Sequence, residues 1–478
     1  MEKFRKHKTA WVLLLISTFF VLLRIPSLAE PHWYGDEGIY QVIGRALLDG
    51  RVLYQDIWDN KPPLLYLIYA AVNGNLYFVK LLSLLSGLCS IFAFYLLSTK
   101  LFVSKKARYI SVGIYAFLFG TPLLEGNIAN AENFMLLPVI FAAYYAFCFV
   151  ESQKKVHMAI SGLLLAVALL TKVVAIFDVA AFLVFLITVS SFQKNRIDVR
   201  PYSIFLLCAF SLTFLAGIVF FFLGALTDFI SAVFIQNISY VGEENAFVFP
   251  MGILIIKTIL LGFVTLLLFL RRSKFSKATI FIYMWVIFGL YSAFFSDRPY
   301  THYLLVLLPA FSLLFGHILE NRKGKIISMV MIIAISFIGY FHFQIYKKTI
   351  PYYKNYLEFM TGGKSIIQYE YFFDANTPRD YNVANFIAMN VSPEESVFLW
   401  SDSPQIYALS NKLPIGKYIV AYHIKFYKNA DIVTKEEIET AKPKYIIQTV
   451  DGPLVNDILS SYHLRYIMEG TKIYERQI

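Results

Sequence analysis

The first 345 residues alternate between long apolar runs and short polar segments. The runs are about 20 residues long, which is the length a helix needs to cross the hydrocarbon core of a bilayer. Continuous runs of this length predict helices rather than a β-barrel. We predict eleven spans, at residues 9–28, 77–98, 109–123, 133–150, 159–170, 173–192, 201–223, 252–270, 278–295, 302–320 and 326–345.

One apolar run, at residues 64–72, is too short to cross a bilayer. It follows Pro62 and Pro63 and ends at an Asn-Gly-Asn sequence. Proline suits the first turn of a helix. We therefore predict a helix that lies at the membrane surface and does not span it.

The distribution of Lys and Arg supports this span count. With a cytoplasmic N-terminus, the predicted inner loops and the N-terminal tail hold about 20 of these residues, and the outer loops about five. This difference satisfies the positive-inside rule, and counting the 64–72 run as a span would reverse every later loop. A cleaved signal peptide is the alternative for residues 9–28, but the run is long for one and no small-residue cleavage site follows it. We expect a multi-pass protein of the plasma (inner) membrane with its N-terminus inside and its C-terminus outside.

Residues 346–478 have the composition of a soluble domain. We predict strands at residues 396–400 and 444–449 and helices at residues 378–389 and 434–441. A turn at residues 402–404 leads into a further helix. We therefore expect a membrane domain over residues 1–345, including an outer loop at 29–76, and a small extracytoplasmic α/β domain over residues 346–478.

Composition excludes several classes of protein. Hydrophobic residues make up 58% of the chain and charged residues only 16%, against about 25% charged in soluble domains. The net charge of +11 comes from short basic clusters between apolar runs, a pattern of membrane orientation rather than of nucleic-acid binding. Cys89, Cys148 and Cys208 lie inside apolar runs without metal-ligand spacing, so we expect neither a disulfide nor a zinc-thiolate site.

The first outer loop carries an acidic pair, Asp36 and Glu37, between two glycines. A carboxylate here could deprotonate an acceptor hydroxyl or amine, or bind a divalent cation. The alternative is a solvated loop in which Asp36 caps a helix over about residues 37–49. Two adjacent acids at the membrane face favour the functional interpretation.

Lys61 begins the predicted surface helix, and Asp59 and Asn60 precede it. A lysine beside a helix N-terminus suits the phosphate of a polyprenyl-phosphate donor. The alternative is a lysine that extends toward lipid headgroups.

Other candidates also lie at the predicted outer ends of spans. Glu132 needs a partner if it is buried, and otherwise is an exposed loop acid. Lys172 either pairs locally with Asp178 or reaches the donor phosphate. Arg298 and His302 form a compact cluster suited to phosphate or acceptor contact, although a lone interfacial histidine is usually structural. Further outer acids are Glu125, Glu243 and Glu244.

The sequence contains no glycine-rich phosphate loop, no Ser-His-Asp set, no HExxH motif and no cytosolic DxD pair. We therefore expect no nucleotide cofactor. Nucleotide sugars and ATP are absent from the extracytoplasmic side, so a sugar donor there must be linked to a lipid.

Several short motifs together resemble a known family. They are the acidic pair, the Lys-Pro-Pro-Leu at 61–64, the acid that ends the second outer loop, and the runs at 169–172, 303–309 and 398–404. The chain resembles the PMT-type GT-C glycosyltransferases, a group that includes protein O-mannosyltransferases and the aminoarabinose transferase acting on lipid A. The resemblance covers most of the membrane region.

This resemblance implies an inverting transfer from a polyprenyl-phosphate sugar. By position, Asp36 matches the catalytic base and Glu37 completes the acidic pair, Lys61 matches the phosphate contact, and Glu132 matches a second acidic position. In the aminoarabinose transferases an acid precedes Lys-Pro-Pro, whereas Asn60 stands here. In protein mannosyltransferases a histidine often precedes Pro-Pro, whereas Lys61 stands here. Neither subgroup fits cleanly, so the resemblance does not identify the substrate.

We therefore expect a GT-C-type, mannosyltransferase-like enzyme that moves one hexosyl or pentosyl unit. The acceptor is a cell-envelope glycan or lipid, as in lipopolysaccharide modification, or a protein, and it docks between the first outer loop and the C-terminal domain. Arg298 and Lys172 assist at the donor phosphate. Glu132, His302 and Asp59 are candidates for contact with the acceptor or with a divalent metal (Mg, Mn or Zn).

The alternative function is a lipid-linked sugar flippase or transporter. Transporters often have repeated halves and ionisable groups near mid-membrane. The sequence shows no repeat, and apart from Lys80, Asp178 and Lys257 the candidate groups collect on one predicted face. A structural or assembly protein is a third class, but it does not explain the acidic pair together with Lys61.

Overall fold

The computed structural model describes residues 2–191, 198–238, 241, 251–321, 324–343, 345–452 and 458–477. Glu243 and Glu244 lie outside the described residues. The chain divides into two compact units. The helical unit consists of Met1–Ser27, Lys80–Ile218 and Val233–Thr349, and the mixed unit of Leu28–Val79, Val219–Ala232 and Ile350–Ile478.

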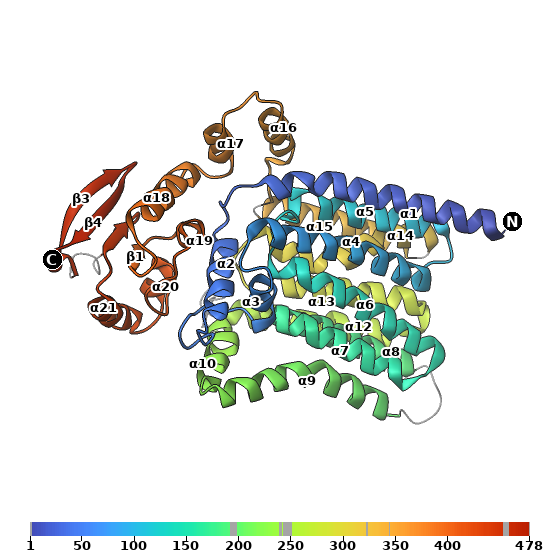
Figure 1. Ribbon diagram of the computed structural model, residues 1–478. Coiled ribbons are helices and arrows are strands. Elements are labelled where there is room, and N and C mark those ends of the chain that lie inside the picture. The colour runs from blue at the N-terminus through green and yellow to red at the C-terminus, as the bar shows by residue number, and fades with distance from the viewer. Residues whose placement is uncertain are drawn as a thin grey trace. The chain divides into compact units, whose positions relative to one another are not determined.

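Long helices that run side by side form most of the helical unit (Figure 1). The long helices of the membrane region are α1 (Glu2–Arg24), α4 (Leu76–Leu101), α5 (Lys105–Gly120), α6 (Ala131–Ser152), α7 (Lys155–Thr171), α8 (Ile176–Ser190), α9 (Arg200–Phe222), α12 (Gly252–Leu270), α13 (Lys277–Ala293), α14 (Leu308–Glu320) and α15 (Lys325–Phe341). Short 3-10 segments include η2 (Pro122–Leu124), η3 (Val173–Ala175) and η6 (Thr301–Leu307).

Each predicted span falls on one of these helices. In the part of the chain that is described, seven helices are long and apolar enough to cross a membrane: Lys8–Ala29, Leu76–Leu101, Ala131–Ser152, Val173–Ser190, Arg200–Phe222, Gly252–Leu270 and Thr301–Glu320. Helices α7, α13 and α15 are apolar but shorter. The prediction of a polytopic helical membrane protein is confirmed, and the count of eleven spans and the orientation stay predictions.

Close helix packing holds the helical unit together. Helix α6 packs on α7, α5 on α14, and α8 on α13. The rings of Phe182 and Trp285 join α8 to α13 at a centroid distance of 5.4 Å. Gly162 on α7 has no room for a side chain, because a Cβ there would collide with the backbone oxygen of Phe205 on α9. Small residues permit such close approach in membrane helix bundles.

Two short helices form the first part of the mixed unit, α2 (Gly35–Leu48) and α3 (Pro63–Ala70). Helix α3 occupies the short apolar run, as predicted, and its place at the membrane surface stays a prediction. Helix α2 packs on both α3 and α19 (Gln405–Ser410). A Cβ on Gly38 would lie 2.9 Å from the backbone nitrogen of Gln405, so glycine permits the contact between α2 and α19.

The C-terminal part of the mixed unit contains a four-stranded sheet in the order β1-β2-β4-β3. Strands β1 (Val397–Trp400) and β2 (Tyr445–Gln448) are parallel, and β4 (Thr471–Arg476) pairs antiparallel with both β2 and β3 (Tyr462–Met468). The helices of this part are α16 (Thr349–Met360), α17 (Ile366–Phe373), α18 (Thr377–Asn390), α19, α20 (Ala421–Phe426) and α21 (Ala430–Ala441). The predicted small α/β domain is confirmed, and the β3–β4 hairpin is an addition to it.

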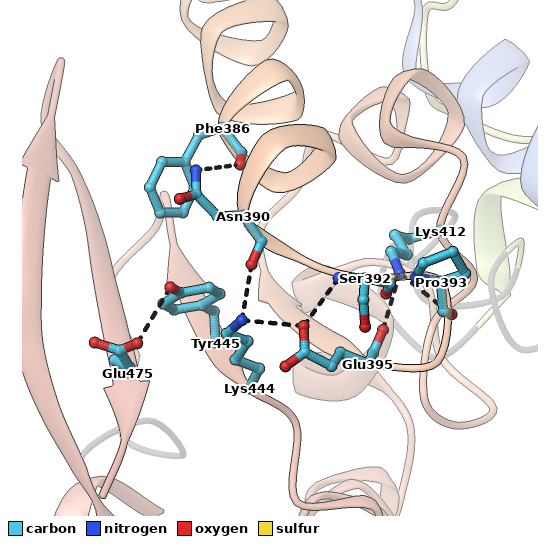
Figure 2. A network of polar contacts seen from close by, with 9 residues as sticks. All are labelled: Phe386, Asn390, Ser392, Pro393, Glu395, Lys412, Lys444, Tyr445 and Glu475. Atoms are coloured by element: carbon cyan, nitrogen blue, oxygen red, sulfur yellow. Dashed lines mark hydrogen bonds and ion pairs between the residues drawn. The ribbon is translucent and has the colours of Figure 1, made fainter.

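A polar network fastens α18 to the first two strands of the sheet (Figure 2). The Lys444 ammonium donates to the backbone oxygen of Asn390 (2.9 Å) and to the Glu395 carboxylate (3.0 Å). Lys412 donates to the backbone oxygens of Ser392 and Glu395. The two lysines thereby fix the turn between α18 and β1. Residues of β1 and β2 form one hydrophobic core with residues of α20 and α21.

Candidate active site

The acidic pair lies in the first turn of α2 and does not cap it. Tyr34 is the N-cap residue, and no side chain caps the helix. The alternative in which Asp36 caps a helix from about residue 37 does not hold, because the helix already begins at Gly35. Carboxylates in the first turn are favoured by the helix dipole. Asp36 is half-buried and accepts a hydrogen bond of 3.2 Å from the Tyr40 hydroxyl, whereas the Glu37 side chain is buried.

Tyr69 on α3 lies close enough to both carboxylates of α2 to be affected by their charges. Its ring packs on that of Tyr40 at 5.4 Å. Burial, and then the charges of Glu37 and Asp36, raise the pKa of the Tyr69 phenol well above its usual value. The Tyr69 phenol therefore stays protonated and neutral beside the two acids.

Two buried tyrosines hold the backbone of Lys61 in place. The Tyr54 hydroxyl donates to the Lys61 carbonyl oxygen (2.7 Å), and the Lys61 N–H donates to the Tyr66 hydroxyl (3.1 Å). Tyr66 in turn donates to the buried Asp59 carboxylate at 2.8 Å. The half-buried Lys61 ammonium donates to the side-chain oxygen of Asn60 (2.7 Å). Asp59 thus holds Tyr66 in place, and the two tyrosines fix the backbone that carries the Lys61 side chain.

The C-terminal part of the mixed unit adds a histidine to this site. His423, on α20, is buried, and its ring meets that of Trp58 at 4.9 Å. Burial, and then the positive charge of Lys61, lower the pKa of His423 to about 3, and the charge of Asp36 opposes this effect. The ring contact places His423 beside the segment that carries Lys61, and the charges of Lys61 and Asp36 both reach the imidazole, so we group Asp36, Lys61 and His423 as the loop site.

Sequence reasoning missed His423. Its helix has only six residues and lies far from the first outer loop in the sequence. The one local signal was the density of rings in its segment, where Tyr418, Tyr422 and Tyr427 accompany it. That pattern is equally typical of a domain core.

A second cluster, which we name the ion-pair cluster, lies in the helical unit. Glu132, in the first turn of α6, forms an ion pair with Lys172, the C-cap residue of α7, and both are buried. His302 on η6 lies with Nε2 3.9 Å from the Glu132 carboxylate and Nδ1 3.0 Å from that of Glu125. The Tyr303 ring lies 5.0 Å from the Lys172 ammonium. The structure thus joins three of the predicted site residues, Glu132, Lys172 and His302.

Two details of this cluster differ from the sequence prediction. Lys172 pairs with Glu132 and not with Asp178, whose carboxylate instead accepts a 2.8 Å hydrogen bond from the Trp285 indole. Arg298 is half-buried in the turn before η6, where its backbone N–H donates to the Ser296 hydroxyl at 3.3 Å.

The described residues offer no group of three or more His, Cys, Asp or Glu side chains that could hold a metal ion. The expectation that a divalent metal takes part stays a prediction.

Comparison with known proteins agrees with this architecture. Residues 60–216, which include Lys61, Glu132 and Lys172, match the family model described as dolichyl-phosphate-mannose-protein mannosyltransferase. The family likeness in sequence covers this part of the membrane region. No curated protein sequence matches the chain.

Solved structures extend the likeness to the whole chain. The structure of ArnT from Cupriavidus metallidurans bound to undecaprenyl phosphate has a TM-score of 0.58 and 14% sequence identity, over 98% of both chains. The same protein in its apo state gives a TM-score of 0.57 and 13% identity, again over 98% of both chains. At these identities the likeness establishes the fold, and it extends beyond the residues that the family model matches.

Proposed function

We propose that this protein is an inverting glycosyltransferase that moves a single sugar from a polyprenyl-phosphate donor to an acceptor on the extracytoplasmic side of the membrane. The observation that carries the proposal is the loop site, where a half-buried carboxylate and a lysine ammonium act on one buried imidazole. A base and a phosphate-binding cation in one place are the two groups that this transfer requires. The family match and the undecaprenyl phosphate bound to ArnT support a lipid-linked donor.

The transfer proceeds in one displacement. A hydroxyl or amine of the acceptor attacks the anomeric carbon of the donor sugar, and the bond from that carbon to the phosphate oxygen breaks. Asp36 takes the acceptor proton as the new glycosidic bond forms, and the electron pair of the broken bond stays on the polyprenyl phosphate. The phosphate is already a good leaving group, so Lys61 stabilises its charge and no general acid is needed.

The hydrogen-bond partners of the two groups suit these roles. Asp36 accepts from a neutral hydroxyl, that of Tyr40, which orients the carboxylate without removing its charge. Lys61 stands immediately before Pro62 and the N-terminus of α3, where backbone N–H groups add to the field that attracts an anion. Glu37 is buried behind Asp36 and raises the negative potential at the base.

The substitution Asp36→Asn tests the proposal, with Asp49→Asn as its control. Asn keeps the shape of the side chain and cannot accept a proton, so turnover should fall by about 10²–10⁴-fold, the usual contribution of a general base. Asp49 is exposed at the C-terminal end of the same helix and should tolerate the change. The assay follows a radiolabelled sugar from polyprenyl-phosphate hexoses and pentoses to acceptor in reconstituted vesicles.

This assay also separates the transferase from a flippase. A transferase forms a new glycosidic product and releases polyprenyl phosphate, whereas a flippase moves intact donor between leaflets. Normal turnover in a well-expressed Asp36→Asn variant would remove Asp36 from the mechanism. Donor movement without a glycosylated product would replace the transferase proposal as a whole.

A further inference from the structure

Helices α16 and α17 form a hairpin whose inner side is filled by aromatic side chains (Figure 1). The rings of Phe359 and Tyr369 stack at a centroid distance of 4.3 Å and join the two helices. The Tyr352 hydroxyl donates to the Glu30 carboxylate at 2.5 Å, and the Tyr369 hydroxyl donates to the Ala29 carbonyl oxygen at 3.2 Å. The inner side of the hairpin therefore holds the start of the first outer loop.

The outer side of the same hairpin is apolar. One charged residue stands among the exposed positions of α16, which are Ile350, Pro351, Lys354, Leu357 and Met360. A helix that faces water normally carries polar residues on that side. Six large apolar side chains of the hairpin are 59–81% exposed, and we name them the hairpin patch: Ile350, Leu357, Met360, Ile366, Ile367 and Tyr371. An exposed apolar patch of this kind marks contact with another protein or with a membrane.

The chain reaches this hairpin directly from a predicted membrane helix. The last turn of α15 exposes the rings of Tyr340 and Phe341. The Lys347 ammonium lies 5.5 Å from the Tyr340 ring, an arrangement that suits the headgroup level, where tyrosine rings and lysine side chains concentrate. Helix α16 begins two residues later, at Thr349, and two residues extend over about 7 Å at most. The hairpin therefore begins at the membrane boundary that α15 reaches.

The composition around the patch favours lipid over protein as the partner. Residues 346–371 contain six tyrosines, the residue type that is enriched with tryptophan at membrane–water boundaries. Of the two acids in this range, Glu358 pairs with Lys364 at 3.0 Å and Glu370 is buried. Three lysines of the range are exposed: Lys347, Lys348 and Lys354. The outward charge is therefore positive, which complements the phosphates of lipid headgroups.

We propose that the α16–α17 hairpin is a membrane-docking element, with the hairpin patch among the acyl chains and the three exposed lysines at the headgroup phosphates. Surface helices of this kind bury their apolar side about 5–10 Å into the boundary between headgroups and acyl chains. In the predicted orientation this is the outer leaflet. Because Tyr352 binds Glu30, the docked hairpin also holds the start of the first outer loop at the lipid surface. The inference goes beyond the proposed transfer and does not rest on it.

Spin labels on the full-length protein test the lipid contact. Alanine replaces the native Cys89, Cys148 and Cys208, and a nitroxide is attached at Leu357→Cys in nanodiscs of phosphatidylcholine and phosphatidylglycerol. Oxygen, which concentrates in lipid, and a water-soluble nickel chelate then report the contact of the label with each phase. We expect the ratio of oxygen to nickel accessibility to be at least about fivefold higher than at Ile467→Cys. Ile467 is the matched control, because it is 67% exposed, against 59% for Leu357, and lies on β3 of the same unit.

A charge placed in the patch should break the contact. We expect Leu357→Glu to lower the ratio of a label at Met360→Cys to that of the Ile467→Cys label, because a carboxylate is costly among acyl chains. Ile467→Glu should leave the ratio at Met360→Cys unchanged. Met360 is 60% exposed, so its label also takes the place of the first one if the Leu357→Cys protein does not fold.

The outcomes are distinct. A high ratio at Leu357→Cys supports the docked hairpin, whereas equal ratios at Leu357→Cys and Ile467→Cys would overturn it, since the hairpin then faces water. An immobile label that is shielded from both reagents would also overturn it, because the helical unit or a second copy of the chain then covers the patch. An unchanged ratio at Met360→Cys in the Leu357→Glu protein would remove the patch from the contact. None of these measurements needs turnover, so each holds whether or not the protein transfers a sugar.

Discussion

The loop site and the ion-pair cluster both contain acids, a lysine and a histidine, but they use them differently. In the ion-pair cluster, Glu132 and Lys172 are in direct contact and buried, and His302 bridges two acids. In the loop site, Asp36 accepts a hydrogen bond from a neutral hydroxyl and Lys61 donates one to a neutral amide, and both residues are half-buried.

This difference separates charges that stabilise the fold from charges placed to act on a substrate. Two charges that neutralise each other in an ion pair attract a ligand only weakly. Removal of one partner leaves the other charge buried without compensation. A carboxylate whose hydrogen-bond donor is a neutral hydroxyl is not neutralised by that donor. We therefore expect substitutions in the ion-pair cluster to act mainly on stability, and substitutions in the loop site mainly on turnover.

The largest stability effect should come from breaking the Glu132–Lys172 pair. Lys172→Met leaves a charge buried at Glu132 and should reduce the free energy of unfolding by about 3–5 kcal/mol. The double variant with Glu132→Gln should recover much of that loss. Thermal unfolding in detergent measures both.

Lys100→Met is the control for this pair. Lys100 contacts Glu151 at 2.6 Å, but the side chains are 25% and 52% exposed, so the change should cost at most about 1 kcal/mol. A Lys172→Met protein as stable as the Lys100→Met protein would remove the contrast between the two clusters.

The next effect tests how α2 is held. Gly38→Ala adds a Cβ 2.9 Å from the Gln405 backbone nitrogen, and overpacking of this kind costs about 1–3 kcal/mol. The shift should move Asp36 and lower turnover as well. Gly35→Ala is the control, because no atom lies within 4 Å of its added Cβ. Equal behaviour of the two variants would mean that the contact of α2 with α19 does not position the base.

The pH dependence of stability should report His423. Its pKa is lowered from the usual 6.5 to about 3 in the folded protein, so between these values the unfolded chain binds the extra proton. Its contribution to stability is full above pH 6.5 and is lost as the pH falls, by about 1.4 kcal/mol per pH unit within that window. Lys61 faces the imidazole and enlarges this effect, while Asp36 reduces it.

Unfolding measured from pH 7 to pH 4 should therefore be less pH-dependent in His423→Asn than in the wild type. His463→Asn should retain the wild-type dependence, since that side chain is exposed. The same slope in all three proteins would show that His423 is not held neutral by its surroundings.

The smallest effect is expected from Tyr40→Phe, which removes the hydrogen bond to Asp36. Such a bond contributes about 0.5–1.5 kcal/mol, so turnover should fall about three- to tenfold. The exposed Tyr371→Phe serves as the reference. A change in stability without a change in turnover would make Tyr40 a packing residue only.

Sequence patterns predicted local features well. Apolar runs located the membrane helices, a proline-led short run located α3, and buried strand patterns located β1 and β2. They missed the β3–β4 hairpin, although residues 462–466 alternate between apolar and polar side chains. The burial in β3 does not follow this alternation, because the five residues from His463 to Ile467 are all exposed. Turn residues Glu469 and Gly470, both with positive φ, were the remaining signal.

Long-range pairing was beyond the sequence patterns. Lys172 had a nearby acid in the sequence, Asp178, but its partner is Glu132 on another helix. The field of Lys61 and Asp36 at His423 likewise depends on tertiary packing within the mixed unit. Helical period and charge distribution describe one element at a time. They therefore assigned each candidate residue to an element but could not show which candidates on different elements are in contact.

The mixed unit is assembled from three separate segments of the chain, which has a consequence for biogenesis. Its segments Leu28–Val79, Val219–Ala232 and Ile350–Ile478 are separated by most of the membrane helices. During synthesis the first segment emerges long before the last one, and loops of that length must close before the native contacts form. The first loop therefore stays without its partner segments until translation ends, for a time set by synthesis of the intervening helices.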